Sequence, residues 1–130
     1  MTTVLDQATD EKVRILVIDD DPVVGDALKL VLESNRYEAV LVEKGREGII
    51  QAARNLFSIG IIDLFLSDIS GLQVIKTIRE KHPEIKIILM TGKGTPEAFS
   101  AARQLGVVGI LAKPFRPSDV LQLIARALAK

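Results

Sequence analysis

Five short apolar runs, each about the length of one strand, alternate along the chain with five amphipathic segments. Several runs are continuous in Ile, Leu and Val instead of alternating with polar residues, which is typical of strands covered on both faces. The runs are Val13–Ile18, Tyr37–Val42, Ser58–Ile62, Ile85–Met90 and Val108–Leu111.

The segments between the runs share one spacing of apolar residues, i, i+3, i+4 and i+7, which predicts five helices with one apolar face each. The predicted faces are Val24, Ala27, Leu28 and Val31; Ile49, Ala52, Ala53 and Leu56; Gly71, Val74, Ile75 and Ile78; Ala98, Ala101, Ala102 and Leu105; and Leu121, Ile124, Ala125 and Leu128.

Proline and capping residues mark the helix starts. Pro22 and Pro96 suit the first helical position, where a missing N–H costs nothing, and Asp21 and Thr95 precede them as N-caps. A regular alternation of strand and helix predicts an α/β fold, a doubly wound five-stranded parallel sheet with helices on two faces.

Composition excludes several classes of function. Lys plus Arg and Asp plus Glu both number 17, so the chain has no net charge with which to attract nucleic acid or an anionic membrane. There is no cysteine and a single histidine, His82, which excludes disulfides, thiolate zinc sites and multi-histidine metal sites. With no signal peptide and no apolar run of membrane-spanning length, we expect a cytoplasmic protein. We also expect a flexible N-terminal tail at residues 1–12 and one domain at residues 13–130.

Polar side chains stand at the ends of the predicted strands. Asp19–Asp21 follow the first strand, Asp63 ends the third, Thr91 the fourth, and Lys113 follows the fifth. Because ligands of parallel α/β sheets bind outside the carboxyl ends of the strands, we expect these groups to converge there.

Converging carboxylates repel one another unless a cation joins them. Ligands that are all oxygen suit a hard divalent ion, and Mg²⁺ with a phosphate partner fits best. A lysine and a hydroxyl beside the ion would stabilise a phosphoryl group, and one aspartate could itself be the nucleophile that forms an aspartyl phosphate.

Taken together, these residues resemble the receiver domain of two-component response regulators, over nearly the whole chain from Val13 onward. The shared motifs are an acidic pair after the first strand, an Asp after the third, a Thr after the fourth and Lys-Pro after the fifth. In this sequence they are Asp19–Asp20, Asp63, Thr91 and Lys113–Pro114.

The resemblance implies a flavodoxin-like strand order, 2-1-3-4-5, and a cis Lys113–Pro114 bond. It implies that Asp63 accepts a phosphoryl group with the help of Thr91 and Lys113. It also implies that Mg²⁺ is held by Asp19, Asp20, Asp63 and the backbone carbonyl of Phe65.

The implied phosphodonor is a sensor histidine kinase or a histidine phosphotransfer protein. The implied output is a protein contact through the face of the fourth helix, fifth strand and fifth helix, without direct nucleic-acid or membrane binding; homodimerisation is left open. Such a chain is not an enzyme beyond its own phosphorylation and dephosphorylation. Because only one predicted helix follows Lys113, we expect no effector domain here, in either a stand-alone regulator or part of a longer protein.

Two residues depart from the family pattern. Ser67 stands where proline is common, so we expect a more mobile loop after Asp63. Ile110 stands where the family usually has Tyr or Phe, which changes the expected signalling switch. In the same loop, Asp68 is expected to cap or solvate the helix that begins near Gly71.

Two other functions remain open on the sequence. Asp19-x-Asp21 after an apolar strand resembles the haloacid dehalogenase-like phosphatases, in which the first Asp is the nucleophile and the second a general acid. The second alternative is a pseudo-receiver, which keeps the pocket but only binds partners. Phosphorylation of Asp63 would indicate the receiver, and phosphorylation of Asp19 the phosphatase.

Overall fold

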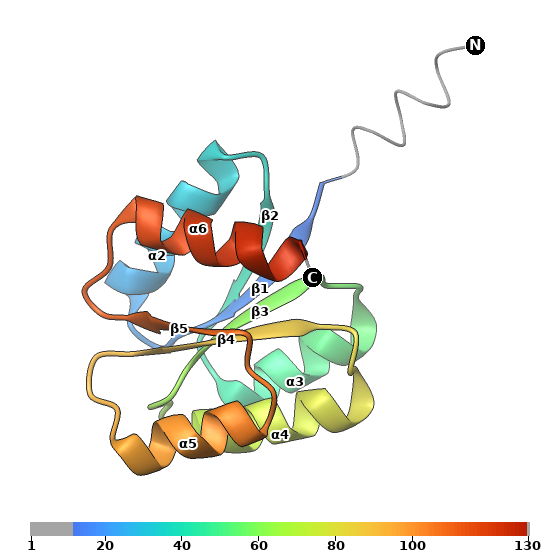
Figure 1. The fold of residues 1–130 in the computed structure, drawn as a ribbon. Coiled ribbons are helices and arrows are strands. Elements are labelled where there is room, and N and C mark those ends of the chain that lie inside the picture. Colours follow the sequence, from blue (N-terminus) through green and yellow to red (C-terminus); the bar gives the residue numbers. More distant parts are fainter. Residues whose placement is uncertain (1–11, 130) are drawn as a thin grey trace.

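The computed structural model describes residues 12–129, which form one sheet with helices on both sides (Figure 1). Apart from Lys12, the tail expected at residues 1–12 lies outside the described residues. None of the described helices is long and apolar enough to cross a membrane. The strands are β1 (Arg14–Ile18), β2 (Glu38–Val42), β3 (Ile59–Asp63), β4 (Lys86–Thr91) and β5 (Gly109–Ala112), and the helices are α2 (Pro22–Ser34), α3 (Gly45–Arg54), α4 (Gly71–Lys81), α5 (Pro96–Gln104) and α6 (Pro117–Leu128).

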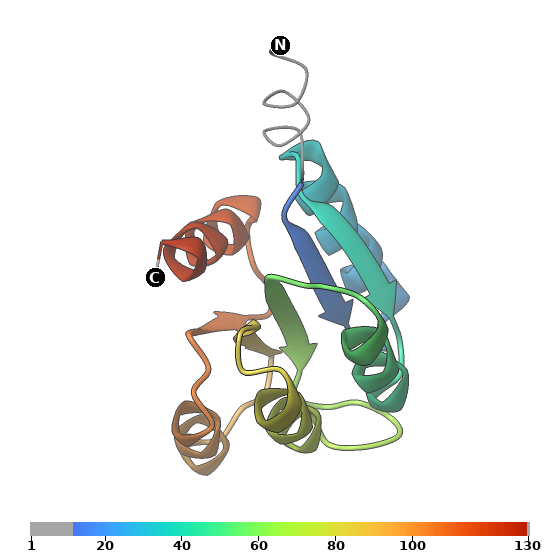
Figure 2. The same cartoon turned by 90° about the vertical axis from the view of Figure 1, so that its right-hand side faces the viewer.

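The strands are ordered β2-β1-β3-β4-β5 and every neighbouring pair is parallel, which confirms the expected fold class and strand order. At the end of β1, Ile18 lies opposite Val42 of β2 and Ile62 of β3. Figure 2 shows the arrowheads of these three strands pointing the same way. All five carboxyl ends therefore meet at one edge of the sheet.

Alternate side chains of each strand enter two separate cores. Ile15 and Val17 of β1 pack on the side of α2 and α6, while Leu16 and Ile18 pack on the side of α3, α4 and α5. All four are at most 1% exposed. Full burial of such a side chain contributes about 1.5–3 kcal/mol, so both faces of the sheet stabilise the edge on which the polar residues lie.

The predicted apolar faces are confirmed for α4 but are rotated in α3, where the expected Ala53 and Leu56 are exposed. The helix ends at Arg54, and its buried side is formed by Gly45, Gly48 and Ala52. A Cβ at Gly48 would lie 2.1 Å from Ile18 Cδ1, so the helix approaches the sheet where it has no side chain. The predicted face included Ala52 but left out Gly45 and Gly48, because a glycine has no side chain to show that the helix approaches the sheet there.

In α2 and α6 the buried faces are likewise displaced from the predicted ones. The expected Ala27 and Ala125 are exposed, and Leu128 is 39% exposed. Both helices carry enough apolar residues to form more than one stripe, and packing against the sheet selects between them. The buried residues are Gly25, Leu28 and Leu32 in α2 and Val120, Ile124 and Ala127 in α6.

Both predicted N-caps are confirmed. The Asp21 carboxylate accepts a hydrogen bond from Val23 N at 3.0 Å, and Thr95 Oγ1 accepts one from Ala98 N at 3.1 Å. These bonds satisfy backbone donors that have no partner within the helix.

The expectation for Asp68 was wrong. The helix that follows it, α4, is capped by Ser70, whose hydroxyl accepts from Leu72 N at 3.2 Å. Asp68 instead accepts from the first two N–H groups of α3, Gly45 at 2.8 Å and Arg46 at 2.9 Å. A cap contributed by a distant segment has no local sequence signal, because capping patterns relate residues a few positions apart.

The first residue of α4, Gly71, lies directly against the end of β3. A Cβ at this position would stand 2.1 Å from the carbonyl oxygen of Asp63 and 2.7 Å from Leu64 Cα. Both obstacles are backbone atoms, which cannot rotate away as a side chain can. The absence of a side chain at Gly71 therefore allows α4 to begin beside Asp63.

We predict that Gly71→Ala lowers the free energy of unfolding by about 1–3 kcal/mol or more, the cost of overpacking, although alanine is the better helix former. The matched control is Gly60→Ala in β3, where an added Cβ meets nothing closer than 3.8 Å. That change should be neutral or stabilising by about 0.5–1 kcal/mol. Urea unfolding followed by circular dichroism measures both, and equal stabilities would show that α4 can retreat without cost.

Candidate functional site

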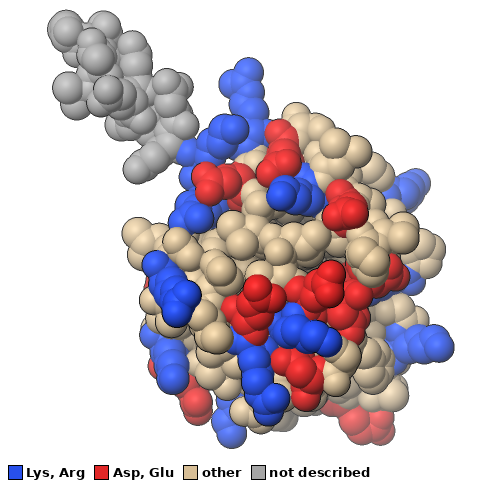
Figure 3. Space-filling view, turned by 180° about the vertical axis from the view of Figure 1, so that it is seen from behind, with Lys and Arg blue, Asp and Glu red and all other residues tan. Residues whose placement is uncertain are grey.

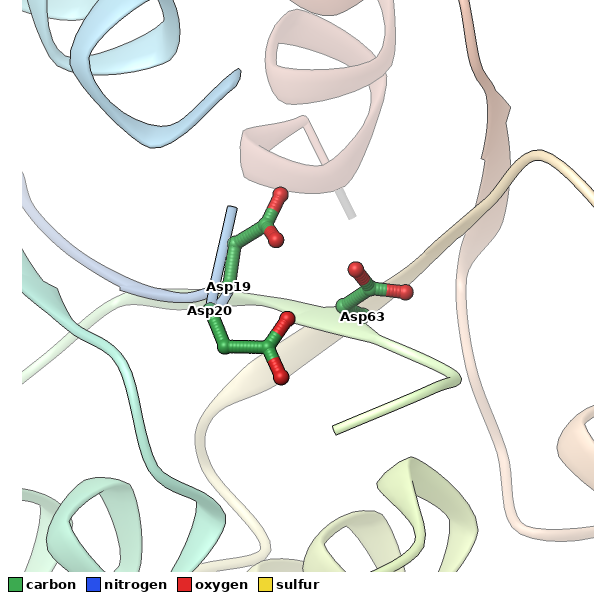
Figure 4. A group of neighbouring side chains, drawn as sticks. All are labelled: Asp19, Asp20 and Asp63. Atoms are coloured by element: carbon green, nitrogen blue, oxygen red, sulfur yellow. The ribbon is translucent and has the colours of Figure 1, made fainter. Parts of the chain in front are cut away.

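Three carboxylates lie together at the carboxyl edge of the sheet. Asp19 and Asp20 follow β1, Asp63 is the last residue of β3, and one oxygen from each lies within 4.8 Å of the others (Figure 4). Asp19 is 1% exposed and Asp63 5%, while Asp20 is half-buried. The convergence expected from the sequence is present, because β1 and β3 are adjacent strands.

Lys113 provides the positive charge at this site. Its Nζ donates a hydrogen bond to Asp63 Oδ2 at 2.7 Å and lies 3.1 Å from Asp19 Oδ2. Its backbone N–H donates to the carbonyl of Thr91 at 3.0 Å, which holds the segment after β5 against the end of β4. The Lys113–Pro114 bond is cis, as expected.

Asp19 is buried with incomplete hydrogen bonding. Its Oδ1 accepts from Asp21 N at 2.9 Å, but Oδ2 is buried and receives no hydrogen bond of acceptable geometry, although Lys113 lies close enough for an ion pair. Burial raises the pKa of Asp19, and this effect outweighs the opposing contributions of the Asp21 N–H and of Lys113. A buried carboxylate oxygen that lacks a hydrogen-bond donor is suited to a cation.

The pKa of Lys113 is raised above its ordinary value. Burial by itself lowers this pKa, but the hydrogen bond to Asp63, the close contact with Asp19 and the charge attraction of both carboxylates together outweigh it. Lys113 is therefore a cation at neutral pH, and its single charge is shared between two of the three clustered carboxylates.

Thr91 and Phe65 complete the surroundings of Asp63. Thr91, the last residue of β4, is buried, and its Oγ1 accepts from Lys93 N at 3.1 Å. The backbone N–H of Phe65 donates to Asp63 Oδ1 at 3.1 Å, while its ring is 59% exposed. Asp21 is outside the carboxylate group, because its side chain caps α2.

The face of the molecule seen from behind carries acidic and basic side chains interspersed with one another (Figure 3). This mixture agrees with the zero net charge of the chain.

Comparison with known proteins supports one assignment. The regulatory protein VanR of Enterococcus faecium is 32% identical over 117 residues, which cover 90% of this chain and 49% of VanR. The acid tolerance regulatory protein ActR of Rhizobium meliloti is 35% identical over 107 residues, which cover 82% of this chain and 55% of ActR. The chain thus spans about half the length of these curated relatives.

A solved structure gives the same result. The response regulator receiver domain protein (CheY-like) from Methanospirillum hungatei matches with a TM-score of 0.89 and 28% identity, over 92% of this chain and 95% of that one. Residues 15–125 match the response regulator receiver domain as a family. With the fold, the strand order and the carboxylate group in agreement, this chain belongs to the receiver domain family of two-component response regulators.

Proposed function

We propose that Asp63 accepts a phosphoryl group from a sensor histidine kinase or a histidine phosphotransfer protein. The observation that supports this most strongly is the placement of Asp63, whose Oδ2 lies 2.7 Å from Lys113 Nζ at the carboxyl edge of the sheet, beside the Asp19–Asp20 pair. A carboxylate oxygen of Asp63 attacks phosphorus, the bond from phosphorus to the donor nitrogen breaks, and the donor imidazole keeps the electron pair.

Mg²⁺ is part of the same proposal. Asp19, Asp20, Asp63 and the backbone carbonyl of Phe65 would hold the ion, and the buried oxygen of Asp19 without a hydrogen bond supports the fit. When bound, Mg²⁺ neutralises negative charge on the carboxylates and on the phosphoryl oxygens. Lys113, which contacts Asp63, and the Thr91 hydroxyl at the end of the neighbouring strand β4 would stabilise the phosphoryl group through charge and a hydrogen bond.

We place the output of phosphorylation on the face formed by α5, β5 and α6, in contact with a downstream protein or an effector domain. Relatives such as the transcriptional regulatory protein GlrR of Escherichia coli are longer, and this chain covers 26% of GlrR, which supports a downstream effector region outside the aligned segment. Ile110 is half-buried and packs against the core on the side of α3, α4 and α5. We expect Ile110 to stay inward whether or not Asp63 is phosphorylated. The cytoplasmic setting and the absence of any further enzymatic activity belong to the same proposal.

The phosphatase alternative has less support. Its general acid would be Asp21, but the carboxylate of this residue is exposed and caps α2. The pseudo-receiver alternative keeps the same pocket, so only a test of phosphorylation can distinguish a pseudo-receiver from a phosphorylated receiver.

We predict that acetyl phosphate with Mg²⁺ adds one phosphoryl group to the chain, because the nucleophile and the cation ligands share one site. Intact-mass analysis should show the addition and its loss on treatment with hydroxylamine, and Asp63→Asn should abolish it. The control is Asp21→Asn, which should still be labelled. Labelling that persists in Asp63→Asn and vanishes in Asp19→Asn would indicate the phosphatase, and an unlabelled wild type the pseudo-receiver.

Mg²⁺ should raise the melting temperature of the wild type, because it binds only the folded site. Among the described residues Asp20 has no ion-pair partner, so Asp20→Asn should stabilise the metal-free protein by about 1 kcal/mol, the Coulomb energy of two charges roughly 5 Å apart in wet surroundings. The same variant should lose most of the Mg²⁺-dependent shift. Thermal melts with and without Mg²⁺ measure both effects, with the exposed Glu80→Gln of α4 as control. A wild type indifferent to Mg²⁺ would remove the metal site.

Lys113→Met should slow labelling by acetyl phosphate and lower the free energy of unfolding at pH 7. Loss of one partner of a buried pair costs about 3–5 kcal/mol, and we expect the lower end because Lys113 is 20% exposed. Because the pair raises the pKa of Lys113, its stabilisation is fully present below the ordinary lysine value of 10.5 and is lost as the pH rises through the raised value. The stability gap to the wild type should therefore hold from pH 7 to pH 9 and narrow above 10.5.

The control for this prediction is Lys76→Met, an exposed lysine of α4. Urea unfolding across the pH series measures the gap. A gap that is equally small for both lysine variants would show that the ion pair contributes little.

A further inference from the structure

The loop that carries Asp63 into α4, residues 64–70, is bound to a distant helix. Both oxygens of Asp68 accept hydrogen bonds from the start of α3, from Gly45 N at 2.8 Å and from Arg46 N at 2.9 Å. A negative charge at a helix N-terminus is also favoured by the helix dipole. The backbone N–H groups, that of Arg46 first, lower the pKa of Asp68 to about 2, so Asp68 is ionised at neutral pH.

A second contact reinforces the first. Lys44 Nζ donates a hydrogen bond to Ser67 Oγ at 2.8 Å. Ser67 is the position for which the sequence predicted a more mobile loop, but here its hydroxyl ties the loop to the residue just before α3. Two consecutive residues of the loop, Ser67 and Asp68, are therefore anchored to three consecutive residues at the α3 start, Lys44, Gly45 and Arg46.

These contacts affect the carboxylate group because of where they lie relative to the strands of the sheet. The loop leaves β3, while α3 follows β2, and β1 lies between these two strands. The Asp68 contacts therefore join segments on either side of the β1 end, where Asp19 and Asp20 stand. On the β2 side, the backbone N–H of Asp19 donates to Val42 O at 3.1 Å.

A chain of bonds results, which the ion pairs of Lys113 with Asp63 and Asp19 close into a circuit. It runs from Asp19 to Val42, along the chain to Gly45, across to Asp68, and back along the loop to Asp63. The start of the loop is held to Asp63 by the hydrogen bond that Phe65 N donates to Asp63 Oδ1. Without the Asp68 hydrogen bonds, Asp19, Asp20 and Asp63 would keep their places at the ends of their strands. The loop that carries the Phe65 carbonyl, however, would lose its attachment to α3.

We propose that Asp68 is a positioning residue of the carboxylate site. By holding loop 64–70 against the start of α3, it sets the position of the Phe65 carbonyl relative to the three carboxylates, and so raises the affinity for a divalent cation. The inference rests on the proposed function, because it concerns the same cation. Removal of groups that orient metal ligands typically lowers metal affinity about 10–100-fold. We expect about tenfold for Asp68→Ala, because Asp68 acts through the backbone of the loop.

The test compares two residues of the same loop that cap different helices, and it uses the whole chain of 130 residues. Asp68→Ala removes the contact to α3, and Ser70→Ala removes the local cap of α4, which does not reach α3. Asp68→Asn is the conservative variant, since its side chain keeps one acceptor oxygen for one of the two N–H groups. Mg²⁺ affinity is measured by calorimetry, Mn²⁺ affinity by electron paramagnetic resonance, stability by urea unfolding, and labelling by acetyl phosphate as a function of Mg²⁺ concentration.

We expect Asp68→Ala and Ser70→Ala to lose similar stability, while only Asp68→Ala loses cation affinity, about tenfold, with Asp68→Asn in between. Labelling of Asp68→Ala should recover at high Mg²⁺ concentration, because the nucleophile itself is intact. If Asp68→Ala fails to fold, the comparison of Asp68→Asn with Ser70→Ala decides, with a loss of affinity again expected only for the former.

Equal affinities of the Asp68 and Ser70 variants would overturn the inference and reduce Asp68 to a helix cap. That outcome differs from failure of the proposed function, in which the wild type itself binds no Mg²⁺ or is not labelled on Asp63. The second outcome would overturn both.

Discussion

The site depends on one electrostatic constraint, the placement of three carboxylates within a few ångströms at the edge of a folded sheet. Asp19 and Asp63 are almost fully buried, and their mutual repulsion would oppose folding if nothing offset it. Lys113 lies within 3.1 Å of both and provides the compensating charge. Its position follows from the strand order, because the chain after β5 must reach past β4 to meet β3. The fold thus brings together charges that would separate in an unfolded chain.

The backbone around these charges is held from several directions. Gly71 lets α4 begin in contact with the carbonyl of Asp63, and the bond from Asp68 to α3 ties the connecting loop to the far side of β1. Loops that carry chemistry are often the mobile part of a domain, but this one is anchored at its start, middle and end. We interpret this anchoring as preorganisation, since ligands held in place need not be ordered when a cation binds.

Transmission of the signal makes a different demand on the structure from the chemistry of phosphorylation. A switch needs two arrangements of similar free energy, and a ligand can shift them only by its differential affinity. At Ile110 this chain has a branched aliphatic side chain with restricted χ1, packed in the same core as Phe99. That packing makes the β4–α5 loop the better candidate for the segment that changes on phosphorylation. In this loop the Thr91 hydroxyl accepts a hydrogen bond from the backbone N–H of Lys93. The chain is a receiver domain in which the acidic group lies together at the carboxyl edge of the sheet.

The sequence alone determined the alternation of strands and helices, because apolar spacing reports directly which residues must be buried. It also determined the group of Asp19, Asp20, Asp63 and Lys113, since each follows or ends a strand and parallel strands finish at one edge. The buried face of α3 was not predictable in this way. Two of its three buried residues are glycines, and only the distance between helix and sheet reveals that α3 comes closest to the sheet at Gly48.

Tertiary structure alone decided the role of Asp68. Its hydrogen-bond partners, Gly45 and Arg46, are 23 and 22 residues away in the sequence, and they come within reach only because β2, β1 and β3 are neighbours in the sheet. Local patterns relate residues within one or two helical turns, so they predicted a cap on the adjacent helix α4. Contacts between elements that are distant in the chain depend on the packing of the whole sheet, and for Asp68 that packing selected α3.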